Sequence, residues 1–291
     1  MKNKLVASIC LLSSALLMAQ SPVSGFMKSA GDGAVVVSYS QESYDKVFLV
    51  PQEIEGVPVF NEVNISSISL FAEVGLTDRL NLILNLPYIE SEGNASEAVL
   101  ENNGFENTRS GIQDVKIYAK YNFYTLMAGR STIDLIGAIG LETPLGNYRA
   151  DEGLQSIIAI GNESSSFNML GTVHFKTAMG LFATGQAGYS FRGNKAPHAL
   201  LSELKLGYAG TKFYVDAFIA NQLSENDGVD ILGEGFEGFF PATRVNFTRV
   251  GLNAYAPLIK GIGLTAGANT YIAGRNVGKA TGFYGGLVYS F

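Results

Sequence analysis

The feature that most constrains the fold is a strict alternation of polar and apolar side chains, which is clearest in the segment DVKIYAKYNF at residues 114–123. Asp114, Lys116 and Lys120 share one parity, whereas Ile117 and Phe123 belong to the other. Successive side chains of a β-strand point to opposite faces, so this segment has one charged and one apolar face. In a membrane the charged face must point into an enclosed interior, because a lysine facing lipid near the midplane costs about 2 to 4 kcal/mol.

Similar segments recur along the chain, each with roughly the 9 to 11 residues that a tilted strand needs to cross a bilayer. We identify about twelve of them. They cover residues 34–43, 64–74, 80–90, 111–124, 131–143, 165–179, 181–191, 199–209, 212–223, 244–258, 263–273 and 281–291. The strands of a soluble sandwich also alternate, but they are usually about 5 to 6 residues long and turn their apolar face inward.

The connections between these segments alternate in length. Short ones, such as 76–79 and the single Gly180, alternate with longer ones, such as 44–63, 91–110 and 144–164. A barrel with tight periplasmic turns at one end and external loops at the other has this arrangement. The sequence therefore predicts an all-β protein, a transmembrane antiparallel up-and-down β-barrel of about 12 strands with both termini in the periplasm.

The first 19 residues have the layout of a secretory signal peptide, with two early lysines, an apolar centre and the small residue Ala19 before a polar stretch. The only cysteine, Cys10, lies within it, so we expect no disulfide in the mature chain. We divide the chain into a signal peptide (1–19), a periplasmic lead-in (20–33) and the barrel (34–291). The lead-in is expected to be a flexible tail, with entry into the barrel lumen as the alternative.

Composition supports a membrane protein that crosses with strands. Hydrophobic residues make up 47% of the chain, yet no mature stretch approaches the roughly 20 consecutive apolar residues of a membrane helix. The formal net charge of −6 argues against nucleic acid as a partner. Tryptophan is absent, so the aromatic girdles must consist of Tyr and Phe, and the final alternating segment places Phe291 in the periplasmic girdle.

Three stretches resemble one family of outer-membrane proteins. They are GLTDRLNLILNLPYI at 75–89, SGIQDVKIYAKYNF at 110–123 and GLETPLGNY at 140–148, which carry Thr-Asp-Arg, Ala-Lys-Tyr and Thr-Pro-x-Gly elements. Together they are similar to the meta-pathway phenol-degradation family of outer-membrane β-barrel transporters. The resemblance implies a channel for small hydrophobic or aromatic molecules rather than a degradative enzyme, and it supplies no catalytic or binding motif. The C-terminal strand ending in Phe291 also resembles the signal that outer-membrane barrels present to the barrel-insertion machinery.

Parity predicts which polar side chains line the lumen. The candidates are Glu73, Asn85, Asp114, Lys116, Lys120, Asp134, His174, Lys176, Glu203, Lys205, Asp216 and Arg249. Glu142 has the same parity. Neighbouring strands carry opposite charges, for example Lys116 or Lys120 near Asp134, and this arrangement admits two interpretations: an ion-pair network that fills a sealed lumen, or a polar track along a pore. A barrel of about twelve strands is compatible with either, and we favour a narrow or partly plugged lumen.

Two long loops carry apolar residues that need cover from water. The candidates are Ile157, Ile158 and Ile160 in the loop at 148–165, and Phe236, Phe239 and Phe240 in the loop at 227–243. They could fold inward as an apolar vestibule, or they could extend the barrel as hairpins above the membrane. The first arrangement suits capture of apolar solutes, and the second is architectural.

Catalysis, cofactors and metal ions are not expected. A serine lipase needs a histidine at the outer rim, but His174 has lumen parity and His198 lies in a short loop. The pattern GEGFEG at 233–238 does not follow a buried parallel strand, so it does not predict a nucleotide site. The acidic loop near Asp227 leaves weak calcium binding open.

These observations predict a protein of the outer membrane of a Gram-negative bacterium. The leading hypothesis is a channel or transporter for passive passage of small hydrophobic or aromatic solutes, in contact with outer-membrane lipid and lipopolysaccharide. The alternative is a structural or assembly barrel with a sealed lumen, for example a partner of exported surface proteins. The identity of the solute, gating and oligomeric state do not follow from the sequence.

Overall fold

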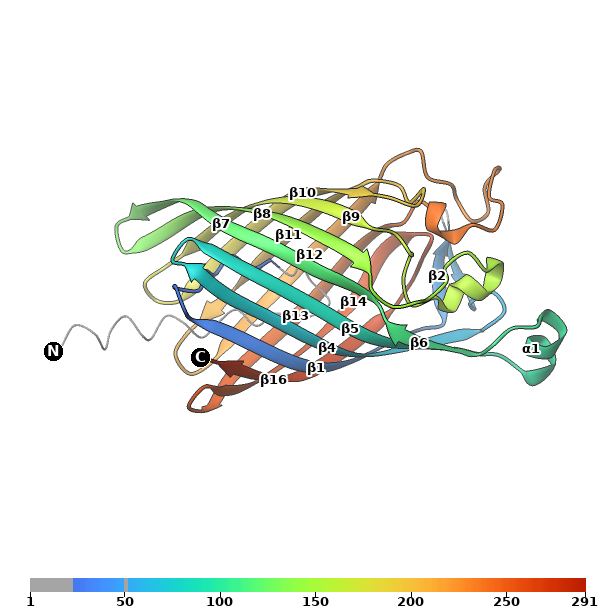
Figure 1. Cartoon of the computed structure of the whole chain (residues 1–291), viewed down its shortest axis with the longest axis horizontal. Helices are drawn as coiled ribbons and strands as arrows, with labels where there is room; N and C mark the ends of the chain where they lie inside the picture. The colour runs from blue at the N-terminus through green and yellow to red at the C-terminus, as the bar shows by residue number, and fades with distance from the viewer. Residues whose placement is uncertain (1–22, 50–51) are drawn as a thin grey trace.

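The computed structural model describes residues 23–49 and 52–291, and within them the chain forms a closed antiparallel barrel of 12 strands (Figure 1). The predicted signal peptide at 1–19 and residues 20–22 lie outside the described residues. The barrel strands are β1 (Gly33–Tyr44), β4 (Glu62–Thr77), β5 (Leu80–Asn94), β7 (Asp114–Ala128), β8 (Ser131–Pro144), β9 (Ser166–Lys176), β10 (Leu181–Arg192), β11 (Ala199–Ala209), β12 (Tyr214–Ser224), β13 (Asn246–Ile259), β14 (Ile262–Arg275) and β16 (Thr281–Ser290). Each of the segments predicted from alternation corresponds to one of these strands, which confirms the fold class.

Closure occurs where the first and last strands meet. β1 pairs with β16 from Ala34↔Ser290 to Ser43↔Thr281, and its other edge pairs with β4. At the start of this seam the amide of Gly33 donates to the carbonyl of Phe291 at 3.0 Å, and the amide of Phe291 donates back at 3.1 Å. All described barrel strands therefore have two neighbours, which leaves no open sheet edge for lipid to solvate.

The barrel has two unlike ends, which we name the turn end and the loop end. The turn end holds the short connections and the pairing of Gly33 with Phe291. Its turns are built by local chemistry: the Thr77 hydroxyl accepts from the amides of Arg79 and Leu80, at 3.2 and 3.0 Å, in the Thr-Asp-Arg turn. Gly180 occupies a left-handed conformation with φ of 91°, which favours glycine because it lacks a Cβ.

The loop end carries the remaining elements (Figure 1). β2 (Lys46–Leu49), β3 (Gln52–Glu55) and β15 (Val277–Gly278) form a small separate sheet, and β6 (Thr108–Ile112) pairs with the upper part of β5. The helix α1 (Glu97–Asn103) is capped by the Ser96 side chain, which accepts from the Val99 amide. Two short 3-10 helices, η2 (Gly153–Ile158) and η3 (Phe240–Ala242), lie in the two longest loops. None of the helices in the described part of the chain is long and apolar enough to cross a membrane.

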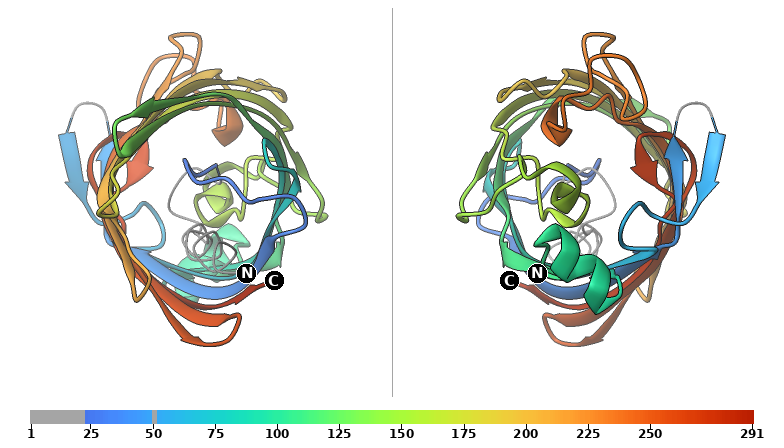
Figure 2. Two further views of the ribbon diagram at one scale, coloured as in Figure 1. Left: turned by 90° about the vertical axis from the view of Figure 1, so that its left-hand side faces the viewer. Right: turned by 90° about the vertical axis from the view of Figure 1, so that its right-hand side faces the viewer.

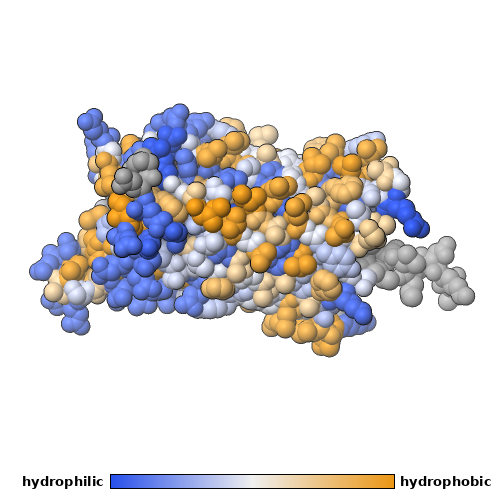
Figure 3. Space-filling view, turned by 180° about the vertical axis from the view of Figure 1, so that it is seen from behind, coloured by the Kyte–Doolittle hydropathy of each residue, from blue (hydrophilic) through white to orange (hydrophobic). Residues whose placement is uncertain are grey.

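The outer surface of the strands is apolar, as the alternation predicts (Figure 3). Leu252 on β13 is 60% exposed, whereas its neighbour Asn253 is buried inside the barrel. The same holds on β7, where Ile117 and Phe123 are exposed and Lys120 is fully buried. The structure thus confirms that the charged parity points inward and the apolar parity outward.

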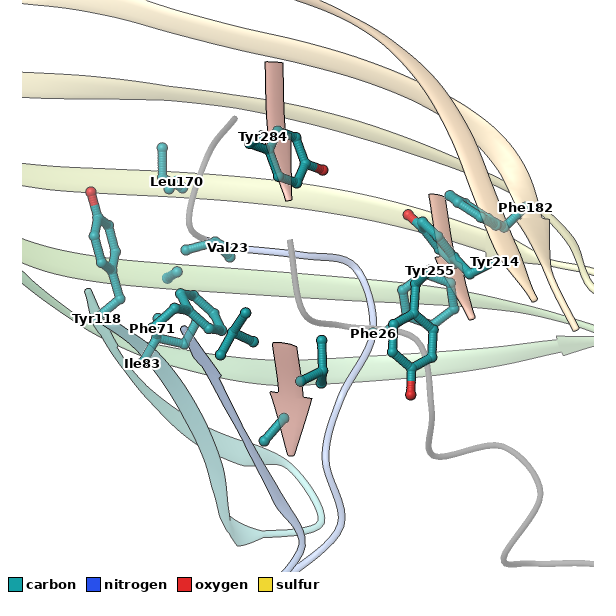
Figure 4. Packing of buried hydrophobic residues seen from close by; sticks show 14 residues of the cluster. Val23, Phe26, Phe71, Ile83, Tyr118, Leu170, Phe182, Tyr214, Tyr255 and Tyr284 are labelled. Carbon is teal, nitrogen blue, oxygen red and sulfur yellow. The ribbon is translucent and has the colours of Figure 1, made fainter. Parts of the chain in front are cut away.

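The turn-end half of the lumen contains a packed hydrophobic core (Figure 4). Its large members are aromatic and aliphatic side chains that point inward from many strands, together with two residues that precede β1. They are Val23, Phe26, Phe71, Ile83, Tyr118, Leu170, Phe182, Tyr214, Tyr255 and Tyr284. The loop-end half of the lumen is hollow, so the two halves of the barrel differ in kind.

Candidate functional site

The segment that precedes β1 lies inside the barrel, at its turn end (Figure 2). We name residues 23–29 the N-terminal plug. Val23, Phe26 and Lys28 are buried, and the Phe26 ring packs edge-on against His174 at 4.4 Å and Phe182 at 5.1 Å between ring centroids. Residues 20–33 were expected to form a flexible periplasmic tail, with entry into the lumen as the alternative. The structure shows the alternative for residues 23–29, because Phe26 is buried in the lumen and the backbone carbonyls of the plug accept hydrogen bonds there.

Lys120 anchors the plug. Its ammonium group lies 2.6 Å from the Glu73 carboxylate and donates to the carbonyls of Phe26 at 2.7 Å and Ser24 at 3.2 Å. Asn81 donates to the same carboxylate at 2.9 Å. Both charged side chains are almost completely buried, so each needs these partners to compensate for lost hydration.

His174 fixes the path of the plug from β9, two strands further round the wall from Lys120. Its Nδ1 hydrogen-bonds with the Thr184 hydroxyl at 2.8 Å, so the ring is held against the strand. The plug passes this ring at Gly25, where an added Cβ would lie 2.4 Å from His174 Nδ1. Close passage therefore requires glycine at this position. His174 thus has a packing role beneath the plug, far from any outer rim.

The structure also shows which interior charges pair. Lys120 pairs with Glu73, not with Asp134 as parity suggested. On β8 the residue opposite Lys120 is Ala138, whereas Asp134 lies opposite Thr125. On the other side, β5 places Asn81 beside Lys120, and Glu73 lies on β4, the next strand. Asp134 accepts instead from Asn122 at 3.1 Å and from Thr125 at 2.5 Å. Lys116 lies 3.3 Å from Glu142.

The remaining predicted interior residues also lie on the inner side. Glu203 and Lys205 are buried 3.5 Å apart, and Asp216 accepts from Tyr214 at 2.5 Å and from Asn253 at 2.7 Å. Asn85 accepts from Ser69 at 2.7 Å, and Lys176 lies over the Phe26 ring at 5.4 Å. Asp114 accepts a hydrogen bond from Tyr148 of the loop above. Most of these polar groups are therefore satisfied within the wall.

Above the plug, the loop-end half of the lumen holds three adjoining cavities of about 310, 380 and 310 Å³, which we name the loop-end chamber. All three share Lys116 in their lining. Arg249 lines two of them and stacks near the rings of Phe247 and Tyr271, at 5.6 and 5.4 Å. Tyr118 and Tyr284 belong both to the hydrophobic core and to the chamber lining, so they form part of its floor.

The chamber walls combine charge of both signs with apolar surface. Glu142 is paired with Lys116 and accepts from Tyr118 at 2.6 Å and Asn168 at 3.0 Å. Arg192 donates to Gln222 at 2.7 Å. Apolar and aromatic side chains complete the walls: Ile65, Phe71, Ile89, Ile160, Leu201 and Phe247. A small solute in the chamber would meet both kinds of surface.

The loop at 144–164 folds inward across the mouth of the barrel (Figure 2). Ile158 belongs to a buried hydrophobic cluster with Val47, Phe60 and Val63, and the half-buried Ile157 packs against this cluster. Ile160 is also buried. Gln155 latches the loop to its neighbour, since its side chain both donates to the carbonyl and accepts from the amide of Glu106, at 2.8 and 2.9 Å. Of the two arrangements left open for this loop, the structure shows the inward one.

The loop at 225–245 covers the mouth from the other side. Phe236 and Phe240 pack edge-on at 5.2 Å, and Phe239 lies near Lys195, but all three phenylalanines remain half-exposed. Arg275 clamps the loop with two hydrogen bonds to Asp230, at 2.8 and 2.5 Å, and Asn276 adds a third at 2.8 Å. The hydrogen bond from Arg275 lowers the pKa of the Asp230 carboxyl below its ordinary value.

Sequence reasoning missed several groups in the lumen. Alternation does place four tyrosines on the inward face: Tyr118, Tyr214, Tyr255 and Tyr284. It does not by itself predict that these rings pack together and fill the turn-end half of the lumen. Arg192, at the end of its strand, was also overlooked. For the plug, the only signals were the burial-prone Phe26 and the glycine before it.

The two histidines considered from the sequence both have partners other than a serine. His198 accepts from the Arg192 amide at 2.9 Å, and His174 contacts Thr184 rather than a serine. Among the residues that the structure describes, no cluster of three or more His, Cys, Asp or Glu side chains could hold a metal ion. Asp227 and Glu234 of the acidic loop are both exposed.

Comparison with known proteins relates the fold, but not the sequence, to proteins already characterised. No protein-family model matches the chain, so membership of the meta-pathway phenol-degradation family is not confirmed, and no curated protein matches it. An outer membrane channel from Pseudomonas putida F1 has a similar crystal structure, with a TM-score of 0.72 at 15% identity over 94% of this chain and 100% of that one. The translocator domain of the autotransporter NalP from Neisseria meningitidis aligns at a TM-score of 0.48 and 14% identity, over 91% and 90% of the two chains. The KdgM porin aligns at a TM-score of 0.44 and 9% identity, over 88% of this chain and 99% of that one. The first of these similarities supports the fold of an outer-membrane β-barrel.

Proposed function

We propose that this protein is an outer-membrane channel of a Gram-negative bacterium that lets small hydrophobic or aromatic solutes cross passively. The observation that carries the proposal is the loop-end chamber, a set of adjoining cavities of about 310 to 380 Å³ that lies inside the barrel under apolar loops. A lumen built only for support would be filled with side chains, as its turn-end half is. The hollow half therefore favours a path for solute.

In this proposal the loop end faces outward and the turn end, with the N-terminal plug, faces the periplasm. The apolar outer belt contacts lipid, and the polar loop surface contacts lipopolysaccharide. Solutes enter between the inward-folded loops and reach the chamber, whose apolar and charged groups hold them transiently. The plug below the chamber restricts the exit, so passage depends on its displacement.

Solute flux into vesicles tests the proposal directly. Purified protein is reconstituted into liposomes, and permeation of benzenesulfonate and of a sugar acid of the same charge, neither of which crosses lipid readily by itself, is compared with protein-free vesicles. We expect protein-dependent entry of both solutes to exceed that of the empty vesicles, and entry of the aromatic sulfonate to be faster than that of the sugar acid. If vesicles that contain folded barrels are no more permeable than empty ones, the channel function is wrong.

A second function, that of a structural or assembly barrel with a sealed lumen, has one observation in its favour. The plug, the buried ion pair of Lys120 and Glu73, and the surrounding aromatic core close the turn-end half tightly. Such a barrel would act through its loops, as a partner of exported surface proteins. Purification from native membranes under mild conditions discriminates the two, because an assembly barrel should retain a stoichiometric protein partner and a channel should not.

A further inference from the structure

Two arginines lie in one of the three cavities of the loop-end chamber. This cavity, of about 310 Å³, is lined by residues of every barrel strand from β7 to β13, and we name it the arginine cavity. Arg192 lies at the end of β10, and Arg249 lies on β13. Both residues are half-buried rather than enclosed, so a solute in the cavity reaches both side chains.

The wall does not compensate the positive charge of these two arginines. The carboxylates that line the arginine cavity are each paired with a lysine: Glu142 with Lys116 at 3.3 Å, and Glu203 with Lys205 at 3.5 Å. Within the described part of the chain, neither Arg192 nor Arg249 forms an ion pair with Asp or Glu. Glu42 lines an adjoining cavity together with Arg249, but the two form no ion pair. The arginine cavity therefore has a surplus of positive charge, which an anionic ligand would compensate.

Contacts within the wall hold both guanidinium groups in place. Arg192 donates to the Gln222 side chain at 2.7 Å. Arg249 lies over the rings of Phe247 and Tyr271, and it donates to the Tyr271 hydroxyl at 3.3 Å. Since an arginine side chain carries five N–H donors, each of the two keeps donors for a ligand. Their fixed positions lower the cost of ordering them when the ligand binds.

The strand register brings the two arginines to the same part of the cavity. Gln222 of β12, which accepts from Arg192, lies opposite Phe247 of β13. Phe247 precedes Arg249 by two residues and therefore points to the same side of the strand. Both guanidinium groups thus lie around one space rather than at separate ends of the chamber.

The rest of the arginine cavity offers apolar surface to the remainder of a ligand. Leu170, Leu201, Ala220 and Phe247 line it. An apolar cavity of roughly 150 Å³ is large enough to bind benzene, so a cavity of about 310 Å³ has room for a six-membered ring and an attached carboxylate.

We propose that the arginine cavity is a binding site for small organic anions that consist of a compact apolar group and one carboxylate, with the carboxylate hydrogen-bonded to Arg192 and Arg249. The planar guanidinium group matches a carboxylate, to which it donates two parallel hydrogen bonds. The inference rests on the proposed channel function in treating this ligand as a transported solute, and it adds the charge of that solute. Neutral solutes of the same shape also enter the cavity but bind more weakly.

Binding of cyclohexanecarboxylate and cyclohexanecarboxamide to the detergent-purified protein tests the site, because these probes have nearly the same shape and differ in charge. Near neutral pH we expect the carboxylate to bind at least about 10-fold more tightly than the amide, after correction for micelle partitioning, because hydrogen bonds between charged groups are the stronger ones. Arg192→Gln and Arg249→Gln should each weaken carboxylate binding by about 10-fold and leave amide binding unchanged. Arg149→Gln, which removes a loop-end arginine outside the cavity, is the matched control and should behave as wild type.

A conservative variant separates charge from packing. Arg249→Lys keeps the positive charge and should retain part of the preference for the carboxylate, and folding of each variant is checked by the heat-dependent gel shift of intact barrels. Equal affinity of wild type for the two probes overturns the inference, even if vesicles pass solute and the channel function stands. Equal carboxylate binding by wild type and the double variant Arg192→Gln with Arg249→Gln overturns it as well. Conversely, arginine-dependent carboxylate binding with impermeable vesicles supports the site while the channel function fails.

Discussion

Substitution of Lys120 by methionine should release the N-terminal plug from the barrel wall. Lys120 donates two charge-assisted hydrogen bonds to plug carbonyls, to Phe26 at 2.7 Å and to Ser24 at 3.2 Å. Hydrogen bonds to charged groups contribute about 1.5 to 3 kcal/mol each, so their loss destabilises the docked plug by about 3 to 6 kcal/mol. Since about 1.4 kcal/mol corresponds to a factor of ten, the docking equilibrium should shift by at least about 100-fold.

Two measurements report this shift. In planar bilayers, Lys120→Met should show larger or more frequent conductance steps than wild type. A Ser24→Cys substitution places a single thiol in the plug, since the only natural cysteine is Cys10, and a water-soluble thiol reagent should label it much faster in the Lys120→Met background. Both readouts follow the plug rather than overall folding.

The single variant also leaves Glu73 charged and buried, which by itself costs several kcal/mol. The double variant Glu73→Gln with Lys120→Met removes that charge and should show the same released plug in a more stable barrel. Lys116→Met, which removes a lumen lysine that pairs with Glu142 above the plug, is the matched control for thiol labelling. If Ser24→Cys stays protected and conductance stays at the wild-type level in the double variant, Lys120 does not hold the plug.

Three other changes test other parts of the structure. The carboxyl of Asp230 has a pKa below its ordinary value of 3.8 because Arg275 donates a hydrogen bond to it. The pair therefore stabilises its loop above pH 3.8 and loses this contribution as the pH falls through the lowered pKa. Protease resistance of the loop should be constant from pH 7 to about 4 and then decline, and Asp230→Asn should flatten this pH profile. Leu252→Arg places a charge on the lipid face and should lower the free energy of unfolding in urea by about 2 to 4 kcal/mol in vesicles; a change within about 0.5 kcal/mol would contradict the outward orientation of this residue. Phe291→Ser removes the ring that covers Gly33 and the expected insertion signal; the amount of folded barrel in cell membranes should fall while refolding in detergent does not, and equal amounts in membranes would argue against the signal.

The barrel itself could be predicted because every membrane-crossing strand must turn its charged side chains away from the hydrocarbon of the bilayer. Lys116 and Lys120 can point only inward, so their parity fixes the faces of β7, and the same argument applied to each segment gives all the barrel strands and their order. The predicted and observed ends of the strands differ by a few residues at the turn end. For example, β9 ends at Lys176 rather than at 179, because Thr177 and Gly180 form the turn with Leu181.

The candidate site was less predictable because it depends on contacts between distant segments. The plug has no periodicity, and Ser24 and Phe26 meet Lys120 only after closure of the barrel, with more than 90 residues between them. A cavity of about 190 Å³ among the loops is likewise lined by residues of β2 and η2 together with Thr243. Sequence reasoning did indicate that Ile157, Ile158 and Phe240 needed cover, but the direction in which the loops fold is decided by the side chains they meet.

The packed and hollow halves of the lumen give every strand a gradient of rigidity along its length. Near the turn end a strand is braced from within by aromatic rings, whereas near the loop end it is held only by its neighbours and the loops. Slow breathing of the sheet should therefore concentrate in the upper part, and backbone amides there should exchange with solvent deuterium sooner than amides of the same strand lower down. Any sideways escape of a solute between strands would have to use that softer rim.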